Sequence, residues 1–461
     1  MIGEYLEGVL APVDDELDFF KLPVQGEIPE GLRGTYLRNG PNAAFQPRPG
    51  YHLWDGDGMI HAITFDDTGV SYRNRWIQTP GLGAERKAGR ALYGGMRDRE
   101  VPPPELVGDV GPVKNVANTN VIRHQGRTLA LWEGGKPTAL THDLETIGLD
   151  DFAGQLVGSM TAHPKIDPVT GELLFFGYSP IPPYLRYHVV DASGKLVRSV
   201  DIDLPGPVMM HDFVVTREHV VFFDSPAAFD LKAFIQGEPM IRWATELGTR
   251  VGVMPRDGDA DDLRWIEIDN AYVFHFLNAW SDGDQVHVTG ASADWLIIDY
   301  KNDVAPPGID PSGYLCSFTI DLARGTCKKA RIGELPGEFC KVPDAVAGLK
   351  NRYGYLATFS TGVENGANFD SLTQYDLESG RQTLHPFGTD KIVGEPAFAP
   401  DPAGSAENDG WIVTYVHEAD GSASEFVVLD ARDFGAEPVA RIPMPRRVPL
   451  GFHGNWMPPA P

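Results

Sequence analysis

The sequence predicts an all-β propeller, in which several antiparallel sheets surround a central axis. The 461 residues include 51 Gly and 38 Pro spread along the whole chain, and such even punctuation is typical of many short strands joined by turns. Long amphipathic helical patterns are scarce. A hairpin signature also recurs, in which a β-rich run ends in Asp and a Gly a few residues later precedes the next β-rich run.

This hairpin signature has a physical basis. The Asp side chain caps the turn, and Gly adopts the positive φ that the turn needs. Several such hairpins are expected in a propeller of four-stranded blades. Their spacing is irregular, so a pair of β-sandwiches remains the alternative at this point. Five clear examples and then two looser ones lie at 66–69, 167–171, 191–194, 321–325, 376–380, 143–148 and 430–435.

The helical patterns are few, and the chain shows no linker or low-complexity break. The best helix candidates are Pro226–Ile235 and a turn near Ala84–Tyr93. Hydrophobic residues make up 42% of the chain and charged residues 22%, which allows a sizeable core. We therefore expect residues 1–461 to form a single domain.

Net charge and cysteine content restrict the partners. With 39 basic and 64 acidic residues, the formal charge is −25, which argues against nucleic acid and against docking on anionic lipid through a basic patch. A small apolar contact with a membrane stays open. Three cysteines without a CxxC pair, Cys316, Cys327 and Cys340, fit a reducing compartment. No signal peptide or spanning segment is evident, so we expect a cytoplasmic protein, either free or peripheral to a membrane.

Four of the 13 histidines interrupt apolar or aromatic runs that should be buried. A buried imidazole needs hydrogen-bond partners or a metal. The four are far apart in the chain, so they lack local zinc-type spacing and would have to converge in the fold. They are His163, His211, His275 and His453. The ordinary interpretation, a hydrogen-bonded core or surface residue, applies to His124, His142, His188, His219, His287, His385 and His417.

Motifs along the chain carry a resemblance to a known family. They are GTYLRNGPN at 34–42, WDGDGMIH at 54–61, ANTN at 117–120 and LWEGG at 131–135, followed in order by the four histidine contexts. From about residue 20 to the end, the sequence resembles the carotenoid cleavage oxygenases, a family that includes stilbene-cleaving enzymes and retinoid isomerases. The resemblance implies a seven-bladed propeller with short helices and loops forming a cap over an axial metal site.

The same resemblance implies a set of site residues. The family's iron ligands fall on the four histidines named above, with one Fe(II) per chain. Its outer carboxylates, which hydrogen bond three of the four imidazoles, fall on Glu133, Glu338 and Glu395, and His163 is expected to lack such a partner. His61 lies in a family motif without being a ligand, and we interpret the Asp55–Gly58 string as a tight turn rather than a calcium loop.

The implied chemistry is cleavage of a carbon–carbon double bond with O2 to give two carbonyl products. Fe(II) accepts imidazole readily, and carboxylates one shell out would fix the imidazole tautomer and offset the metal charge. Thr119 matches a family position whose side chain leans toward the iron, although a plain strand threonine is an equal alternative. The substrate should be apolar, and a tunnel lined by aromatic residues would suit it. The candidates for this lining, for each of which plain core packing is the alternative, are Trp132, Phe274, Phe276, Trp280 and Phe452.

The choice of substrate rests on one position. Stilbene-cleaving members carry a Lys immediately before the glutamate that matches Glu133, whereas this chain has Trp132 there and Lys136 is displaced. We therefore expect an apocarotenoid or carotenoid, with a stilbene or phenylpropenoid as the alternative. A retinyl-ester isomerohydrolase and a metal-free binding scaffold are further alternatives. The apolar segments 181–185 and 229–240 are expected to form the tunnel mouth, to dip into a membrane, or to be buried loops.

Overall fold

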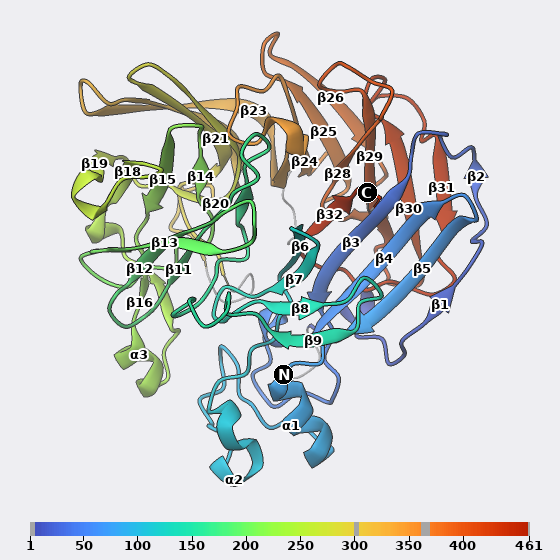
Figure 1. Ribbon diagram of the computed structural model, residues 1–461, viewed down its shortest axis with the longest axis horizontal. Helices are drawn as coiled ribbons and strands as arrows, with labels where there is room; N and C mark the ends of the chain where they lie inside the picture. The colour runs from blue at the N-terminus through green and yellow to red at the C-terminus, as the bar shows by residue number, and fades with distance from the viewer. Residues whose placement is uncertain (1–4, 299–303, 361–368, 460–461) are drawn as a thin grey trace.

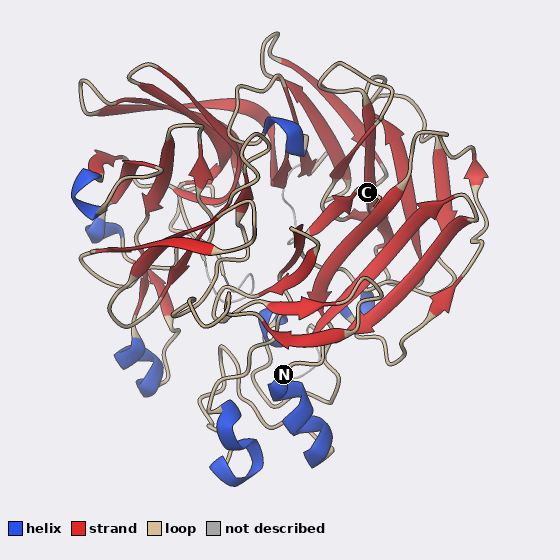
Figure 2. Ribbon diagram, in the orientation of Figure 1, coloured by secondary structure: helices blue, strands red, loops and turns tan. Residues whose placement is uncertain are grey.

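Antiparallel strands arranged around a central axis make up most of the chain (Figure 1, Figure 2). The structure is a computed structural model, and it describes residues 5–298, 304–360 and 369–459. Within these ranges, five separate sheets form one blade each and a seven-stranded sheet forms two more, which gives seven blades. The predicted propeller is confirmed.

The first blade closes the ring, because strand β32 near the C-terminus pairs with β3 near the N-terminus, where Arg38 lies opposite Gly454. Both ends of the chain are thus held in one sheet. In sheet order its strands are β1 (Asp18–Phe19), β5 (Gly69–Trp76), β4 (Gly58–Asp66), β3 (Gly34–Pro41) and β32 (Gly454–Met457).

The next three blades are four-stranded meanders, interrupted once by a separate two-stranded ribbon. The second blade contains β6 (Asn120–His124), β7 (Arg127–Leu131), β8 (Thr138–Leu140) and β9 (Thr146–Leu149). The third contains β10 (Lys165–Ile166), β11 (Leu173–Tyr178), β12 (Leu185–Val190) and β13 (Leu196–Ile202). The fourth contains β14 (Val214–Val215), β15 (His219–Asp224), β18 (Thr249–Pro255) and β19 (Arg264–Ile268), and the ribbon is β16 (Ala227–Phe229) with β17 (Ile241–Trp243).

The fifth and sixth blades share one long strand, β23 (Thr326–Lys341). Its first part pairs with β22 and its last part with β24, so the chain passes from the edge of one blade into the next. The other strands are β20 (Tyr272–Asp282), β21 (Gln285–Ala293), β22 (Tyr314–Asp321), β24 (Tyr353–Thr358), β25 (Ser371–Asp376) and β26 (Arg381–Pro386). The seventh blade contains β2 (Gln25–Gly26), β31 (Ala440–Pro443), β30 (Ser424–Asp430), β29 (Gly410–Glu418), β27 (Lys391–Val393) and β28 (Ala397–Pro400).

The five clear hairpin predictions are correct. Each joins consecutive antiparallel strands, and the glycine at each has a positive φ, from 64° at Gly325 to 121° at Gly69. The two looser examples are less regular. Gly148 lies inside β9, and Gly435 lies in the connection between β30 and β31.

The helices are short, and the three α-helices project beyond the strands at the lower edge of the view (Figure 1, Figure 2). The prediction of a helix over Pro226–Ile235 is wrong in its first half, because Ala227–Phe229 pairs with β17 and the helix begins only after Asp230, which caps it. Helix α1 begins before the predicted 84–93 turn, because Thr79 accepts a hydrogen bond from the Leu82 N–H. The helices are α1 (Pro80–Ala88), α2 (Pro104–Val107) and α3 (Leu231–Gln236), with 3₁₀ turns at Gly8–Leu10, Leu53–Asp55, Gly108–Val110, Thr245–Leu247, Ala260–Asp262 and Asp344–Val346. In the described part of the chain, none has the length and apolar character to cross a membrane.

The hydrophobic core lies between neighbouring blades. Phe176 and Tyr187 of the third blade, for example, pack against Phe213 and Phe222 at the fourth. Such packing between blades fixes the position of each inner strand. Because the core lies between the blades, polar side chains can lie along the axis.

Candidate metal centre

Four histidines from four different blades meet on the propeller axis. His163, His211 and His453 each lie just before an innermost strand, β10, β14 and β32, whereas His275 lies within the innermost strand β20. Each residue is at most 8% exposed. Residues far apart in the chain are thus brought to one point, and one nitrogen from each ring lies within 4.8 Å of the others.

The distances between these nitrogens match a shared ion. The Nε2 atom of His211 lies 2.9 Å from that of His163 and 3.2 Å from that of His275. Two nitrogens bound at right angles to one ion, with bonds of about 2.1 Å, would lie about 3.0 Å apart. The cluster can therefore hold a metal ion.

Three of the imidazoles are oriented by glutamates. His211 Nδ1 lies 2.7 Å from Glu133 and His275 Nδ1 lies 2.8 Å from Glu338. His453 Nδ1 lies 2.9 Å from Glu395, whose other oxygen accepts the Gly454 N–H at 2.7 Å. Because a carboxylate accepts the Nδ1 proton, it leaves each Nε2 lone pair pointing toward the axis.

His163 is held differently. Among the described residues, no carboxylate is hydrogen bonded to its ring. Its backbone N–H donates to the Thr161 hydroxyl at 3.1 Å, and that hydroxyl donates to the carbonyl of His211 at 3.2 Å. The His163 segment is thus tied to the His211 segment through the Thr161 hydroxyl, and no glutamate is involved.

The electrostatics favour neutral imidazoles beside a cation. Burial, together with the neighbouring histidines, holds the pKa of His163 and of His275 well below the usual range, and neutral imidazole is the form that binds metal. Burial raises the pKa of Glu338 well above its ordinary value. Burial alone would also raise the pKa of Glu395, but Lys341 and His453 keep it lowered. A cation among the rings would balance these buried carboxyl groups.

Of the aromatic residues predicted to contact substrate, Phe274 lies closest to the cluster. Its ring centroid is 4.4 Å from that of His211, and it packs against Tyr272 and Trp54. Trp132 precedes Glu133 and covers the backbone at Gly134. Phe274, Tyr272 and Trp54 thus form an aromatic wall beside His211.

Two other predicted substrate residues lie in the core or far along the strand. Phe276 is 4% exposed and packs against Phe223 and Phe318 between blades, so the packed-core interpretation applies to it. Trp280, near the end of β20, stacks on His287 at 4.1 Å. The structure shows packing contacts for both side chains, the second of the two alternatives, and a tunnel role for them stays an untested prediction.

The remaining predicted residues have local roles. Thr119 lies beside the cluster, because its carbonyl accepts the His453 N–H at 3.2 Å, and its hydroxyl donates to Asn118. The Phe452 N–H donates to the carbonyl of Asn39. His61 is buried against Tyr72, away from the metal cluster. The Asp55 carboxylate accepts backbone N–H groups, including that of Met96, as a structural turn would.

Sequence reasoning missed several residues near the centre. The Phe339 ring lies 5.5 Å from the rings of both His275 and His453. Tyr178 stacks on Phe229 and packs in the same cluster as Phe274. Burial, together with the charge of Glu133, raises the pKa of its hydroxyl well above the usual range. Asp212 is 3% exposed and is hydrogen bonded to residues distant in the chain. The only sequence signal was a charged residue inside the apolar run at 208–213.

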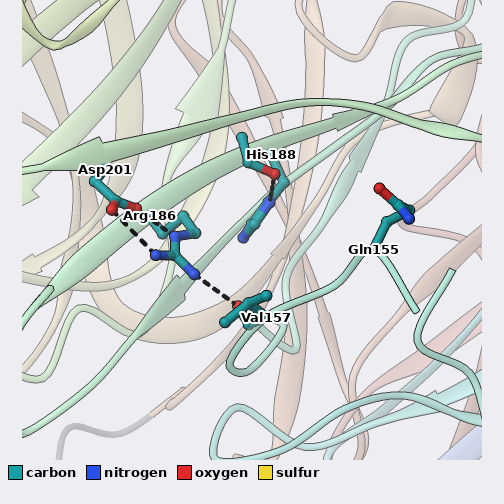
Figure 3. Close-up of a pocket in the computed structure, with 6 residues that line it drawn as sticks. Gln155, Val157, Arg186, His188 and Asp201 are labelled. Atoms are coloured by element: carbon teal, nitrogen blue, oxygen red, sulfur yellow. Dashed lines mark hydrogen bonds and ion pairs between the residues drawn. The ribbon is translucent and has the colours of Figure 1, made fainter.

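A polar cavity of about 380 Å³ lies elsewhere, over β12 and β13 (Figure 3). Within it, Arg186 is paired with Asp201 and donates to the carbonyl of Val157, while His188 is hydrogen bonded to Ser199. None of the four clustered histidines lines it. The cavity is therefore separate from the metal centre.

Comparisons with known proteins agree with this geometry. Residues 10–458 match the sequence model of the retinal pigment epithelial membrane protein family. A carotenoid cleavage oxygenase of Mycobacterium tuberculosis is 35% identical over 98% of this chain and 97% of its own length. An isoeugenol monooxygenase of Pseudomonas nitroreducens is 34% identical over 98% of both chains. The crystal structure of lignostilbene dioxygenase from Pseudomonas brassicacearum superposes with a TM-score of 0.91, at 31% identity over 98% of both chains.

Proposed function

Because this chain belongs to the family of carotenoid cleavage oxygenases and the retinal pigment epithelial membrane protein, we propose that it is an iron(II) oxygenase that cleaves a carbon–carbon double bond of an apocarotenoid or carotenoid. The observation that carries the proposal is the convergence of four buried imidazoles within 4.8 Å. That the protein is an oxidoreductase acting on an alkene follows from its relatives. The identities of the metal and of the substrate are what we propose.

His163, His211, His275 and His453 would hold the iron. This set of nitrogens suits Fe(II), which accepts imidazole readily. Four imidazoles would fill only part of the coordination sphere and would leave room for O2. When bound, Fe(II) would supply the activation of O2, whose two atoms are added across the double bond to give two carbonyl products. No protein group has to gain or lose a proton in that balance.

The protein's own residues orient the imidazoles and screen the centre from water. Glu133, Glu338 and Glu395 each keep a proton on an Nδ1 atom, so that the Nε2 atoms face the axis. Phe274 and its aromatic neighbours would exclude water and hold an apolar alkene beside the centre. Positioning is therefore the main contribution of the chain.

Two observations support the ranking of substrates. The residue before Glu133 is Trp132, which offers no cation or flexible donor to a phenol. The wall around Phe274 is apolar, which suits a polyene. A phenylpropenoid or stilbene is the second candidate, because the buried Tyr272 hydroxyl has no hydrogen-bond partner among the described residues and would pair with a phenol.

We further propose that the segments 181–185 and 229–240 form the route by which a lipophilic substrate enters. Ile181 is 64% exposed and Ile235 is 76% exposed. Phe229, at the base of the second segment, stacks on Tyr178 and packs in the same cluster as Phe274, which lies against His211. The second segment thus leads through Phe229 toward the centre, and the exposed apolar residues of both segments would also allow weak contact with a membrane.

The test is aerobic incubation of the Fe(II)-loaded protein with an apocarotenal, with resveratrol and with isoeugenol, with products identified by mass spectrometry. We expect two carbonyl fragments from the apocarotenal. Cleavage of the phenolic substrates alone would reverse the ranking. No cleavage of any alkene by protein that carries stoichiometric iron would contradict the proposed activity.

A further inference from the structure

Asp212 connects the backbone segments that carry three of the four histidines. Its side chain is 2% exposed. One carboxylate oxygen accepts the Lys165 ammonium at 2.8 Å, and Lys165 lies two residues after His163. The other accepts the backbone N–H of Phe276 at 2.9 Å, directly after His275. Asp212 itself follows His211.

The bond to Phe276 lies where strand β20 departs from regular pairing. The register between β20 and β21 shifts between Val273 and Phe276, and again between Phe276 and Asn278. His275 thus lies in a bulged stretch, and a bulge re-aims a side chain at the cost of regular ladder bonds. A carboxylate that accepts the Phe276 N–H replaces one of them. Asp212 therefore stabilises the local shape that directs His275 to the axis.

The bond to Lys165 acts on the histidine that has no glutamate. The ring of His163 is not oriented by a carboxylate, and its segment is tied to the rest by Thr161 and Lys165. A buried carboxylate is costly unless it is paired, so the Lys165–Asp212 pair resists separation. This holds the His163 and His211 segments at a fixed spacing.

We propose that Asp212, with Lys165 as its counter-ion, is a positioning residue that sets the spacing of His163, His211 and His275 around one metal ion. This role rests on the proposed metal centre. The glutamates orient single rings, and Asp212 would in addition align the three backbone segments. Asp212 acts through the backbone and through Lys165, and not by touching the metal or the substrate.

Asp212→Asn is the principal variant. An amide has only one oxygen, so its NH2 group must face either the Phe276 N–H or the Lys165 ammonium, whose acceptor oxygen is shared with the Phe213 N–H. At least one donor loses its acceptor. Loss of such outer support typically weakens metal binding by about 10- to 100-fold, and we expect a loss of that size. The measurement is Co(II) affinity, by competition with a chromophoric chelator. The visible Co(II) absorption should also change, because it reports ligand geometry.

Asp224→Asn is the matched control. Asp224 is also buried and accepts the Arg250 guanidinium at 2.8 Å, but it joins β15 to β18, and within the described residues no hydrogen bond of its side chain reaches a histidine segment. We expect this control to lower the thermal stability of the metal-free protein without changing Co(II) affinity or spectrum. A loss of affinity in both variants would show a general effect of stability and would overturn the proposal.

The Lys165 variants provide an independent test, which can be carried out even if Asp212→Asn does not fold. Lys165→Met should weaken Co(II) binding, and Lys165→Arg, which retains the charge, should restore most of it. Wild-type affinity and spectrum in Asp212→Asn, or in Lys165→Met, would overturn the positioning role. A wild-type protein that binds neither Co(II) nor Fe(II) would instead contradict the proposed function.

Discussion

The Nε2 atoms of His211 and His275 lie 3.2 Å apart, while the Nδ1 atom of each ring is hydrogen bonded to a glutamate. When Nδ1 carries the proton, each Nε2 has a lone pair and no hydrogen. Two buried lone pairs directed at one another repel, and a cation between them removes the repulsion. The arrangement of glutamates therefore makes the axis a site for a positive ion.

Removal of one ring should abolish metal binding. In His211→Ala we expect loss of stoichiometric iron and loss of turnover, with the fold retained, because this ring lies on the axis rather than in the hydrophobic clusters between blades. The measurement is metal content per chain, beside circular dichroism. His287→Ala, which removes a partly exposed histidine of β21, is the control and should keep its iron. Full iron and activity in His211→Ala would show the ligand assignment to be wrong.

Metal removal should lower the stability of the wild-type protein. A ligand that binds only the folded state stabilises it by about 2.7 kcal/mol when its free concentration is one hundred times the dissociation constant. Chelation should reverse this gain, which can be followed as a fall in the midpoint of thermal unfolding. His211→Ala should show no such difference. An equal shift in both proteins would indicate that the metal binds elsewhere.

Gly454→Ala tests the backbone next to His453. A Cβ at this position would lie 2.1 Å from the Tyr36 hydroxyl oxygen, and Tyr36 is 1% exposed with its hydroxyl bonded to the carbonyl of Glu395. Neither partner can move freely. Overpacking of this kind costs about 1–3 kcal/mol, and we expect that loss in urea unfolding, together with weaker metal binding.

Gly83→Ala is the control for that substitution. Gly83 lies within helix α1, and a Cβ there meets nothing within 4 Å. Because alanine is the better helix former by roughly 1 kcal/mol, the control should be unchanged or slightly more stable. Equal stability of the Gly454 variant and the wild type would mean that strand β32 can shift without affecting His453.

The sequence predicts features of this fold that depend on neighbouring residues or on family motifs. The hairpin at 167–171 follows from local turn chemistry, since Asp167 accepts turn N–H groups and Gly171 has a φ of 71°. The four histidines stand out because each interrupts an apolar run. Their convergence could be expected only from the family resemblance, since no local spacing joins them.

Features that depend on distant contacts could not be predicted. Asp212 looks like an ordinary acidic residue. Besides the neighbouring Phe213 N–H, its partners lie 47 and 64 positions away. Phe276 adjoins His275, so the sequence leaves both a tunnel wall and the core open to it. Successive strand residues point to opposite faces, and its ring lies in the core. Phe274 reaches His211 because of the bulge at this point in β20, and a bulge leaves no clear mark in the sequence.

Acid sensitivity should come partly from His417, a histidine outside the metal centre. It is 1% exposed, and burial together with the charge of Arg38 lowers its pKa from 6.5 to about 3. Between these two values the unfolded chain binds a proton that the folded protein does not. Above pH 6.5 this proton uptake has no effect on the free energy of unfolding. As the pH drops toward 3, it lowers the free energy of unfolding by up to about 1.4 kcal/mol per pH unit.

His417→Asn removes this titration while leaving a polar side chain that can still reach Ser424, the hydrogen-bond partner of the imidazole. Urea unfolding of both proteins at a series of pH values from 7.5 to about 4.5 isolates the contribution, because every other titrating group is common to them. The variant should be less stable than the wild type at neutral pH, where its packing is poorer, and the difference should shrink as the pH falls. Parallel stability profiles across that range would show that His417 is protonated as readily in the folded protein as in the unfolded chain, and that burial beside Arg38 does not keep it neutral.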